Sequence, residues 1–174
     1  MWCAPKDLVA AEPSPRLSRE DLMELVRSTF ESLLGMSVAA EACDRVICDL
    51  NRMMGGVHIA GAWNGLVLLL PTETFMRQAA AAMLDVPPVQ VAMADIEDAL
   101  AELCNVLGGG VKSLLPGPSA LALPMVLHGS NYAVSLPRCK LQAGLRFSCQ
   151  QQPLELRVLE QRVGEAAACG TPPA

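Results

Sequence analysis

With 174 residues, the chain is long enough for one domain with a hydrophobic core and short for two. Its net charge is −5 at pH 7, and its thirteen Lys and Arg residues are scattered singly, so no basic surface is available to neutralise a nucleic-acid backbone. No uninterrupted apolar stretch reaches the roughly 18 residues that a membrane span needs. We therefore expect neither nucleic acid nor a membrane as a partner.

The cysteines, histidines and N-terminal residues indicate the compartment and argue against a metal site. The seven cysteines are odd in number and include no CxxC pair, which argues against a disulfide framework and a zinc cluster. His58 and His128, the two histidines, are far apart in the sequence, so no metal site is predicted. Residues 1–16 lack the continuous apolar region of a signal peptide. We expect a cytoplasmic protein with reduced cysteines in its core.

The first part of the chain predicts a leader, a helix and three strands. Residues 1–18 are rich in proline and are predicted to be a flexible leader. Ser18 is placed to cap a helix over 19–34, in which apolar residues recur at helical spacing before Gly35. Antiparallel strands are then predicted over 44–54, 55–63 and 65–71, with turns at Gly55-Gly56 and Asn64-Gly65.

The second part predicts two helices and further strands. A helix is expected over 72–84, opened by Thr72 or Thr74 and followed by Pro87-Pro88, and a longer one over 95–115. Apolar or alternating runs predict strands over 120–129, 131–136, 140–150 and 154–161. In the third of these, five residues are expected to face the core: Leu141, Ala143, Leu145, Phe147 and Cys149.

This order of elements predicts an α+β fold, a largely antiparallel β-sheet packed with long helices. A single domain is expected over 19–162, followed by a disordered tail over 163–174. Hydrophobic residues make up 52% of the chain and aromatics only 3%, so the core is expected to consist of Ala, Leu, Val and Met rather than large rings.

The long predicted helix separates into two stripes. The apolar stripe contains Ile96, Leu100, Leu103, Leu107, Val111 and Leu114. The polar stripe, about 200° away, contains Asp98, Glu102, Asn105, Gly109 and Lys112. A face that merely meets solvent is the ordinary explanation of such a polar stripe, and it remains open here.

Three consecutive glycines, Gly108, Gly109 and Gly110, interrupt this helix. Each glycine costs about 1 kcal/mol relative to alanine inside a helix, so either the helix ends at Gly108 or bulk is excluded there. Because Val111 and Leu114 continue the apolar stripe, the second alternative predicts a smooth patch for close approach of another backbone. The segment 108–113 lacks the glycine that a phosphate loop needs before its lysine, and no GxSxG motif indicates a serine hydrolase.

The pattern Asp98-x3-Glu102-x2-Asn105, followed by the glycines and later by Pro124 in "LALPMVLHG", resembles the signature of the CheC/CheX/FliY family of chemotaxis phosphatases. The similarity is greatest to the CheX-like branch, and in element order it covers roughly residues 19–160. It implies an α+β fold in which a long helix carries the motif and packs against an antiparallel sheet.

The resemblance also implies an activity and a partner. The reaction would be hydrolysis of the aspartyl phosphate of a response-regulator receiver domain, CheY above all. Asn105 would orient the attacking water, and Glu102 would pair with the receiver's lysine. Mg²⁺ would belong to the receiver, so no cofactor of its own is expected. The remaining interface residues would be Asp98, Gly108, Gly109, Gly110, Lys112 and Pro124.

The helix over 19–34 contains no asparagine, so only one site is expected. A single site is what the resemblance to the CheX-like branch implies. The resemblance further implies a homodimer formed through the sheets, for which the strand 140–149 is a candidate edge. Two alternatives to the phosphatase remain open. One is a non-catalytic module that binds a phosphorylated receiver or another chemotaxis or flagellar regulatory protein, and the other is an unrelated α+β domain.

Overall fold

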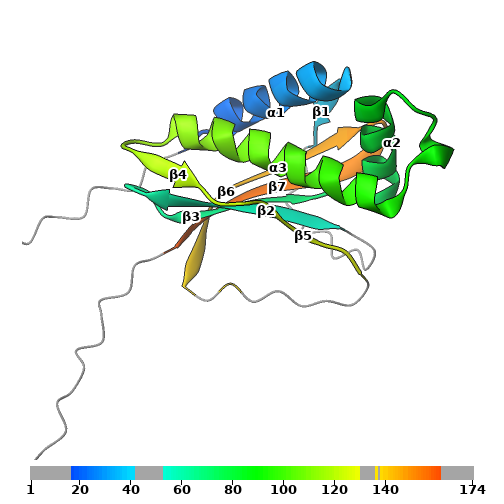
Figure 1. Cartoon of the computed structure of the whole chain (residues 1–174). Coiled ribbons are helices and arrows are strands. Elements are labelled where there is room, and N and C mark those ends of the chain that lie inside the picture. Colours follow the sequence, from blue (N-terminus) through cyan, green and yellow to red (C-terminus); the bar gives the residue numbers. More distant parts are fainter. Residues whose placement is uncertain (1–16, 42–52, 130–135, 137, 162–174) are drawn as a thin grey trace, which may run out of the picture.

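A computed structural model describes residues 17–41, 53–129, 136 and 138–161 of the chain. In these residues the helices cover one face of a single β-sheet (Figure 1). The elements are α1 (Arg19–Leu34), β1 (Val38–Ala40), β2 (Met54–Gly61), β3 (Gly65–Leu70), α2 (Glu73–Leu84), the 3-10 helix η1 (Pro88–Gln90), α3 (Met93–Leu114), β4 (Ser119–Leu121), β5 (Met125–Leu127), β6 (Cys139–Cys149) and β7 (Gln152–Gln161).

The sheet has seven strands in the order β1-β6-β7-β3-β2-β4, and β5 also pairs with β2. Every described strand pair is antiparallel. The predicted α+β class with an antiparallel sheet is therefore confirmed. The predicted tail lies outside the described residues, as do residues 1–16 of the predicted leader and most of the strands expected over 44–54 and 131–136.

Local capping groups fix the ends of the first two helices. The Ser18 hydroxyl accepts a hydrogen bond from the backbone N–H of Asp21 at 3.0 Å, and Gly35 ends α1 with a left-handed φ of 63°. At α2 the hydroxyl of Thr72 accepts from the N–H of Phe75 at 3.1 Å. These contacts confirm the predicted helix over 19–34 and select Thr72 over Thr74 as the cap of α2.

Gly55 and Gly56 do not form the predicted turn, because both lie inside β2. A Cβ on Gly55 would lie 2.4 Å from Sγ of Cys104 on α3. On the next residue, a Cβ at Gly56 would lie 2.6 Å from Cδ2 of Leu68. The glycines are needed for close packing against α3 and β3 rather than for a change of chain direction.

The alternation predicted for the strand over 140–149 is broken by a β-bulge. Leu141 pairs with Leu159, whereas Ala143 pairs with the adjacent residue Val158, so Gln142 is an extra residue in β6. The bulge turns Leu141 to the face away from Ala143, and its side chain is 54% exposed. The prediction that Leu141 faces the core is therefore wrong, while Leu145, Phe147 and Cys149 are buried as expected.

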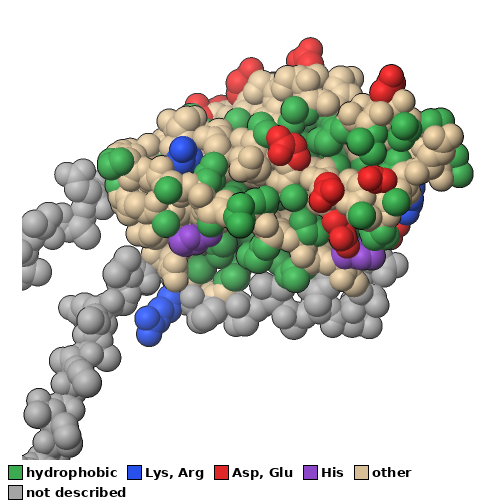
Figure 2. All heavy atoms as spheres, in the orientation of Figure 1, with side chains coloured by type: hydrophobic (Ala, Val, Ile, Leu, Met, Phe, Trp, Pro, Cys, Tyr) green, Lys and Arg blue, Asp and Glu red, His purple; other side chains and the backbone are tan. Residues whose placement is uncertain are grey.

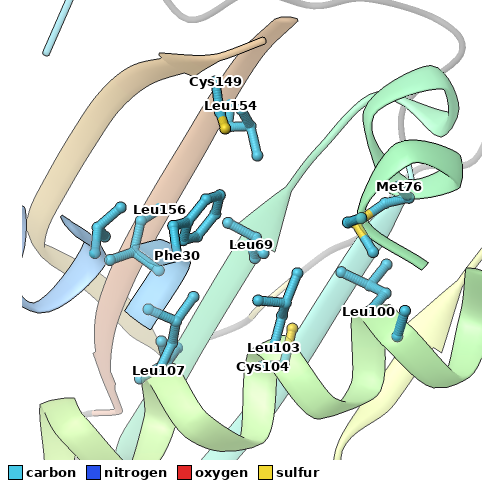
Figure 3. Packing of buried hydrophobic residues seen from close by; sticks show 14 of the residues in the cluster. Phe30, Leu69, Met76, Leu100, Leu103, Cys104, Leu107, Cys149, Leu154 and Leu156 are labelled. Carbon is cyan, nitrogen blue, oxygen red and sulfur yellow. The ribbon is translucent and has the colours of Figure 1, made fainter. Parts of the chain in front are cut away.

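The core lies between the helices and the sheet, and its aliphatic residues come from all three helices and the central strands (Figure 3). All three phenylalanines of the chain meet there. The ring of Phe30 on α1 stacks on Phe75 of α2 at a centroid distance of 5.8 Å and meets the edge of Phe147 on β6 at 5.4 Å. Although aromatics are few, they join two helices to the sheet, so the expectation of a purely aliphatic core is corrected.

Candidate functional site

The long helix α3 is held at its start and along its inner face. The Asp95 carboxylate accepts a hydrogen bond from the backbone N–H of Ala92 at 2.8 Å, which satisfies a group that the helix leaves unpaired. The inner face of α3 packs on β2 and β3, and its flanks contact α1, α2, β4 and β5. The helix continues through the glycines to Leu114, so the alternative in which it ends at Gly108 is excluded.

The outer face of α3 carries the predicted polar residues, here called the α3 stripe: Asp98, Glu102, Asn105, Gly109 and Lys112. At 100° per residue they fall within an arc of about 80°. The side chains of Asp98, Glu102 and Asn105 are exposed, whereas Gly109 and Lys112 are partly buried. Since Glu102 and Asn105 form no hydrogen bond or ion pair with other described residues, both are available to a partner.

Two of the three glycines face the interior of the protein. A Cβ on Gly108, which is buried, would lie 2.3 Å from Cγ1 of Val57 on β2. A Cβ on Gly110 would lie 2.2 Å from Cδ1 of Leu25 on α1. These glycines let the sheet and α1 approach α3 closely, which explains them without a partner. Internal packing thus accounts for Gly108 and Gly110, and their predicted contacts with a partner stay a prediction.

Gly109 differs from its neighbours because it belongs to the α3 stripe. A Cβ there would lie 3.8 Å from Cδ1 of Leu121, which is an ordinary van der Waals contact. Neither the helical backbone nor its neighbours therefore require glycine at this position. Any larger residue at this position would place a side chain on the α3 stripe one turn beyond Asn105. The clearance for a partner that the sequence suggests at Gly109 stays a prediction.

We expect opposite stability effects from alanine at these adjacent positions. Gly109→Ala should raise the free energy of unfolding by about 0.5–1 kcal/mol, since alanine is the better helix former. Gly108→Ala should lower it by about 1–2 kcal/mol, because overpacking against Val57 costs more than the helix gains. Urea denaturation measures both values, and an equal increase for the two variants would contradict the packing described for Gly108.

The cysteine beside Asn105 does not supply a nucleophile. Cys104 is 1% exposed, and its side chain lies on the inner face of α3 against Gly55 of β2. Burial raises the pKa of its thiol to about 12, an effect that a hydrogen bond with the Leu69 backbone only partly offsets. The thiol is therefore protonated near neutral pH and contributes packing rather than chemistry.

The N-terminal end of α3 is acidic and lies beside a histidine. Nδ1 of His128, which follows β5, is 3.9 Å from a carboxylate oxygen of Glu97, and its Nε2 is 3.8 Å from Glu73 on α2. Glu73 also pairs with Arg77 at 2.9 Å. These groups are partly exposed, so their pairing contributes little to stability. Figure 2 shows acidic side chains gathered beside a histidine on one face of the molecule.

Pro124 lies beside α3 in the connection between the edge strands β4 and β5, and it is partly buried. Proline has no N–H to donate to a sheet, and it is tolerated here because Pro124 lies between the paired residues of β4 and β5. Its neighbour Leu123, which was not predicted as a site residue, is 91% exposed. The only sequence signal for that exposure is the position of Leu123 directly before a proline within an apolar run.

In the described part of the chain, no helix is both long enough and apolar enough to cross a membrane. The same residues contain no group of three or more His, Cys, Asp or Glu side chains arranged to hold a metal ion.

Comparison with known structures identifies the same architecture in chemotaxis proteins. The CheX protein of Vibrio vulnificus has a TM-score of 0.66 at 14% identity, over 84% of this chain and 98% of its own. CheX of Desulfovibrio desulfuricans has a TM-score of 0.65 at 16% identity, over 81% of this chain and 97% of its own. At such identities the likeness establishes the fold.

A third structure is a CheX-CheY-BeF3-Mg²⁺ complex from Borrelia burgdorferi, with a TM-score of 0.63 at 13% identity over 82% of this chain and 97% of that one. No curated protein matches the sequence. The family model described as "Chemotaxis phosphatase CheX" matches residues 53–148, which is more than half of the chain and includes the whole α3 stripe. The chain therefore belongs to the CheX family.

Proposed function

We propose that the protein hydrolyses the aspartyl phosphate of a CheY-type receiver domain that docks on the α3 stripe. One observation carries the proposal: Glu102 and Asn105 are exposed one turn apart and without partners among the described residues, on a helix whose other face is buried. The phosphatase description of the family and the CheY partner in the Borrelia structure support it.

Asn105 is assigned the catalytic role. Its amide carries both an acceptor oxygen and N–H donors, so it can hold a water molecule while contacting the phosphoryl group. In-line attack by that water breaks the bond between phosphorus and the receiver's carboxylate oxygen, releasing inorganic phosphate and a free aspartate. Because phosphoryl transfer depends mainly on position and electrostatics, one well-placed amide is a sufficient contribution from this chain.

Glu102 is assigned the docking role, as a partner for the receiver's lysine through a charge-assisted hydrogen bond. Asp98 and Lys112 would contribute at the two ends of the stripe. Mg²⁺ is part of the receiver in this proposal, so the protein itself needs no cofactor.

The partner can be identified with a panel of CheY-type receivers from the same organism, each phosphorylated with acetyl phosphate. We expect this protein to accelerate the loss of phosphate from at least one of them. Binding without acceleration for every receiver would favour the non-catalytic alternative, a module that recognises a phosphorylated receiver or another regulatory protein. If no receiver loses phosphate faster and none binds, the proposal is contradicted.

Gly109→Leu tests the need for a bare helix surface beside Asn105. Leucine is a good helix former, so the fold should be retained, but its side chain would stand in the path of a docking partner. We expect affinity for the receiver charged with beryllium fluoride to fall at least tenfold. Gly109→Ala is the matched control and should bind within about threefold of wild type, since a single methyl group is easily accommodated. Unchanged binding by Gly109→Leu would show that the partner does not cover Gly109.

A homodimer is also proposed, through the outer edge of β6. Among the described strands, β1 pairs with β6 only at Phe147, Ser148 and Cys149, which leaves the edge before Arg146 without a partner strand. Light scattering of the purified protein would give its mass in solution, and a monomer at all concentrations would exclude the dimer.

A further inference from the structure

We propose that Leu123 is an apolar anchor for the receiver, inserting into an apolar patch next to its phosphorylated aspartate. The inference rests on the proposed function, because it assigns a further contact to the same docking event. It concerns the connection Ala122–Pro124 between β4 and β5, which we call the edge bulge.

The edge bulge is defined by strand register. Leu121 pairs with Ile59 of β2, whereas Met125 pairs with Gly56. Three residues of the edge therefore oppose only two residues of β2. The N–H of Ala122 still donates to the carbonyl of His58 at 2.9 Å, and the chain then leaves the ladder. Bulges at sheet edges redirect side chains, and here Leu123 becomes 91% exposed.

The edge bulge lies directly beside the α3 stripe. Cδ1 of Leu121 is 3.8 Å from the position that a Cβ on Gly109 would take, so β4 contacts the stripe one turn beyond Asn105. Leu123 follows two residues later, about 7 Å further along an extended chain. Figure 1 shows β4 and β5 running beside α3, and Figure 2 shows hydrophobic side chains gathered next to the acidic ones on this face.

The stripe is too small to hold a receiver alone. From Asp98 to Lys112 it is about 21 Å long and about 10 Å wide, or about 200 Å², whereas a standard interface covers about 800 Å² on each partner. A domain whose active site reaches Asn105 must therefore also cover the elements on its flanks. On the flank formed by α1, the helix approaches Gly110 through Leu25, and the exposed residues on the same side of α1 are Ser28 and Ser32. That flank is therefore polar, whereas the flank formed by the edge bulge presents Leu123.

The occupant we infer is the receiver rather than a second copy of the chain. A second copy seated on the edge bulge would cover the adjoining α3 stripe and so exclude the phosphorylated partner. A receiver already has to lie over Gly109, and Leu123 is within the same footprint. Burying one leucine side chain at an interface changes affinity by about tenfold to a hundredfold.

Leu123→Glu tests the anchor, with Val89→Glu as the matched control. Val89 is 89% exposed, is also aliphatic, and lies in η1 before α3. It is separated from Asn105 by at least the first twelve residues of α3, or about 18 Å. The probe is the receiver identified in the panel, charged with beryllium fluoride for binding and with acetyl phosphate for turnover.

We expect Leu123→Glu to raise the Kd at least tenfold and to lower kcat/KM by a similar factor, mainly through KM. Leu123→Ala should give a smaller loss, about threefold or more, without adding a charge. Val89→Glu should alter neither constant more than twofold, and circular dichroism should show all variants folded.

Wild-type affinity in Leu123→Glu, or an equal loss in Val89→Glu, would overturn the anchor. If the wild-type protein is a dimer and a Leu123 variant is a monomer that still binds the receiver, the anchor is overturned in favour of a contact with a second copy of the chain. None of these results bears on the hydrolysis itself, which the variant of Asn105 tests separately.

Discussion

Replacing Asn105 by alanine should lower the rate of receiver dephosphorylation at saturating receiver at least a hundredfold. The expected size follows from the loss of one preorganised hydrogen-bonding group at a transition state, which typically costs a factor of about 10²–10³. Because Asn105 is exposed and forms no bond with other described residues, its removal should leave the fold intact. Rates of phosphate loss from the receiver charged with acetyl phosphate measure the effect.

Binding separates this loss from a failure to dock. The Kd for the receiver charged with beryllium fluoride should change less than threefold in Asn105→Ala. Asp98→Ala provides the matched control for the rate at saturating receiver, since Asp98 is also exposed on the same stripe and is assigned a docking contact but no chemistry. A full wild-type rate in Asn105→Ala would remove the asparagine from the mechanism, and parallel losses in both variants would mean that the stripe only docks.

Replacing Glu102 by glutamine should weaken receiver binding at least tenfold. The two side chains have nearly the same shape, so the change removes a charge from the proposed pair with the receiver's lysine. Truncating one member of a charged pair at an interface costs about 2–5 kcal/mol, partly because the remaining charge is left without its partner. Titrations at low and high salt should also show a smaller salt dependence for the variant.

Glu24→Gln is the control for the loss of a negative charge as such. Glu24 is exposed on α1, the helix next to α3, so the variant has the same net charge as Glu102→Gln. It should bind the receiver within about twofold of wild type. Equal weakening by both substitutions would indicate a general electrostatic attraction and would contradict a specific pair at Glu102.

The helices could be predicted from the sequence because their signals are local. Ser18 and Gly35 lie directly at the ends of α1, and each satisfies or terminates the backbone of its own helix. The apolar periodicity of α3 continues past Gly110, and the helix does too. Both features depend on residues a few positions apart, which is the range over which periodicity and capping act.

The sheet could be predicted only in outline, because its details depend on contacts between distant residues. Gly55 has the local appearance of a turn residue, but it is required by Cys104, almost fifty positions away. The bulge that turns Leu141 outward depends on its register with Leu159. Neither the close approach of a helix nor the register of a strand with its partner can be deduced from a single stretch of sequence.

In the candidate site, too, local features could be predicted and features that depend on distant contacts could not. The α3 stripe follows from helix geometry alone, so Glu102 and Asn105 could be placed side by side from their spacing. The inward packing of Gly108 could not be predicted, because it depends on Val57 of a neighbouring strand. Leu123 was missed for a similar reason, since its exposure arises from the register between β2 and the two short strands at the edge.

The most direct test of the phosphatase assignment is a turnover experiment. A CheY-type receiver in excess is kept charged with acetyl phosphate, and inorganic phosphate derived from the receiver is followed with a substoichiometric amount of this protein. We predict many receivers dephosphorylated per molecule of wild-type protein and a rate close to that of the receiver alone with Asn105→Ala. An unchanged rate with wild-type protein, at concentrations where it binds the receiver charged with beryllium fluoride, would contradict the account and leave recognition without hydrolysis.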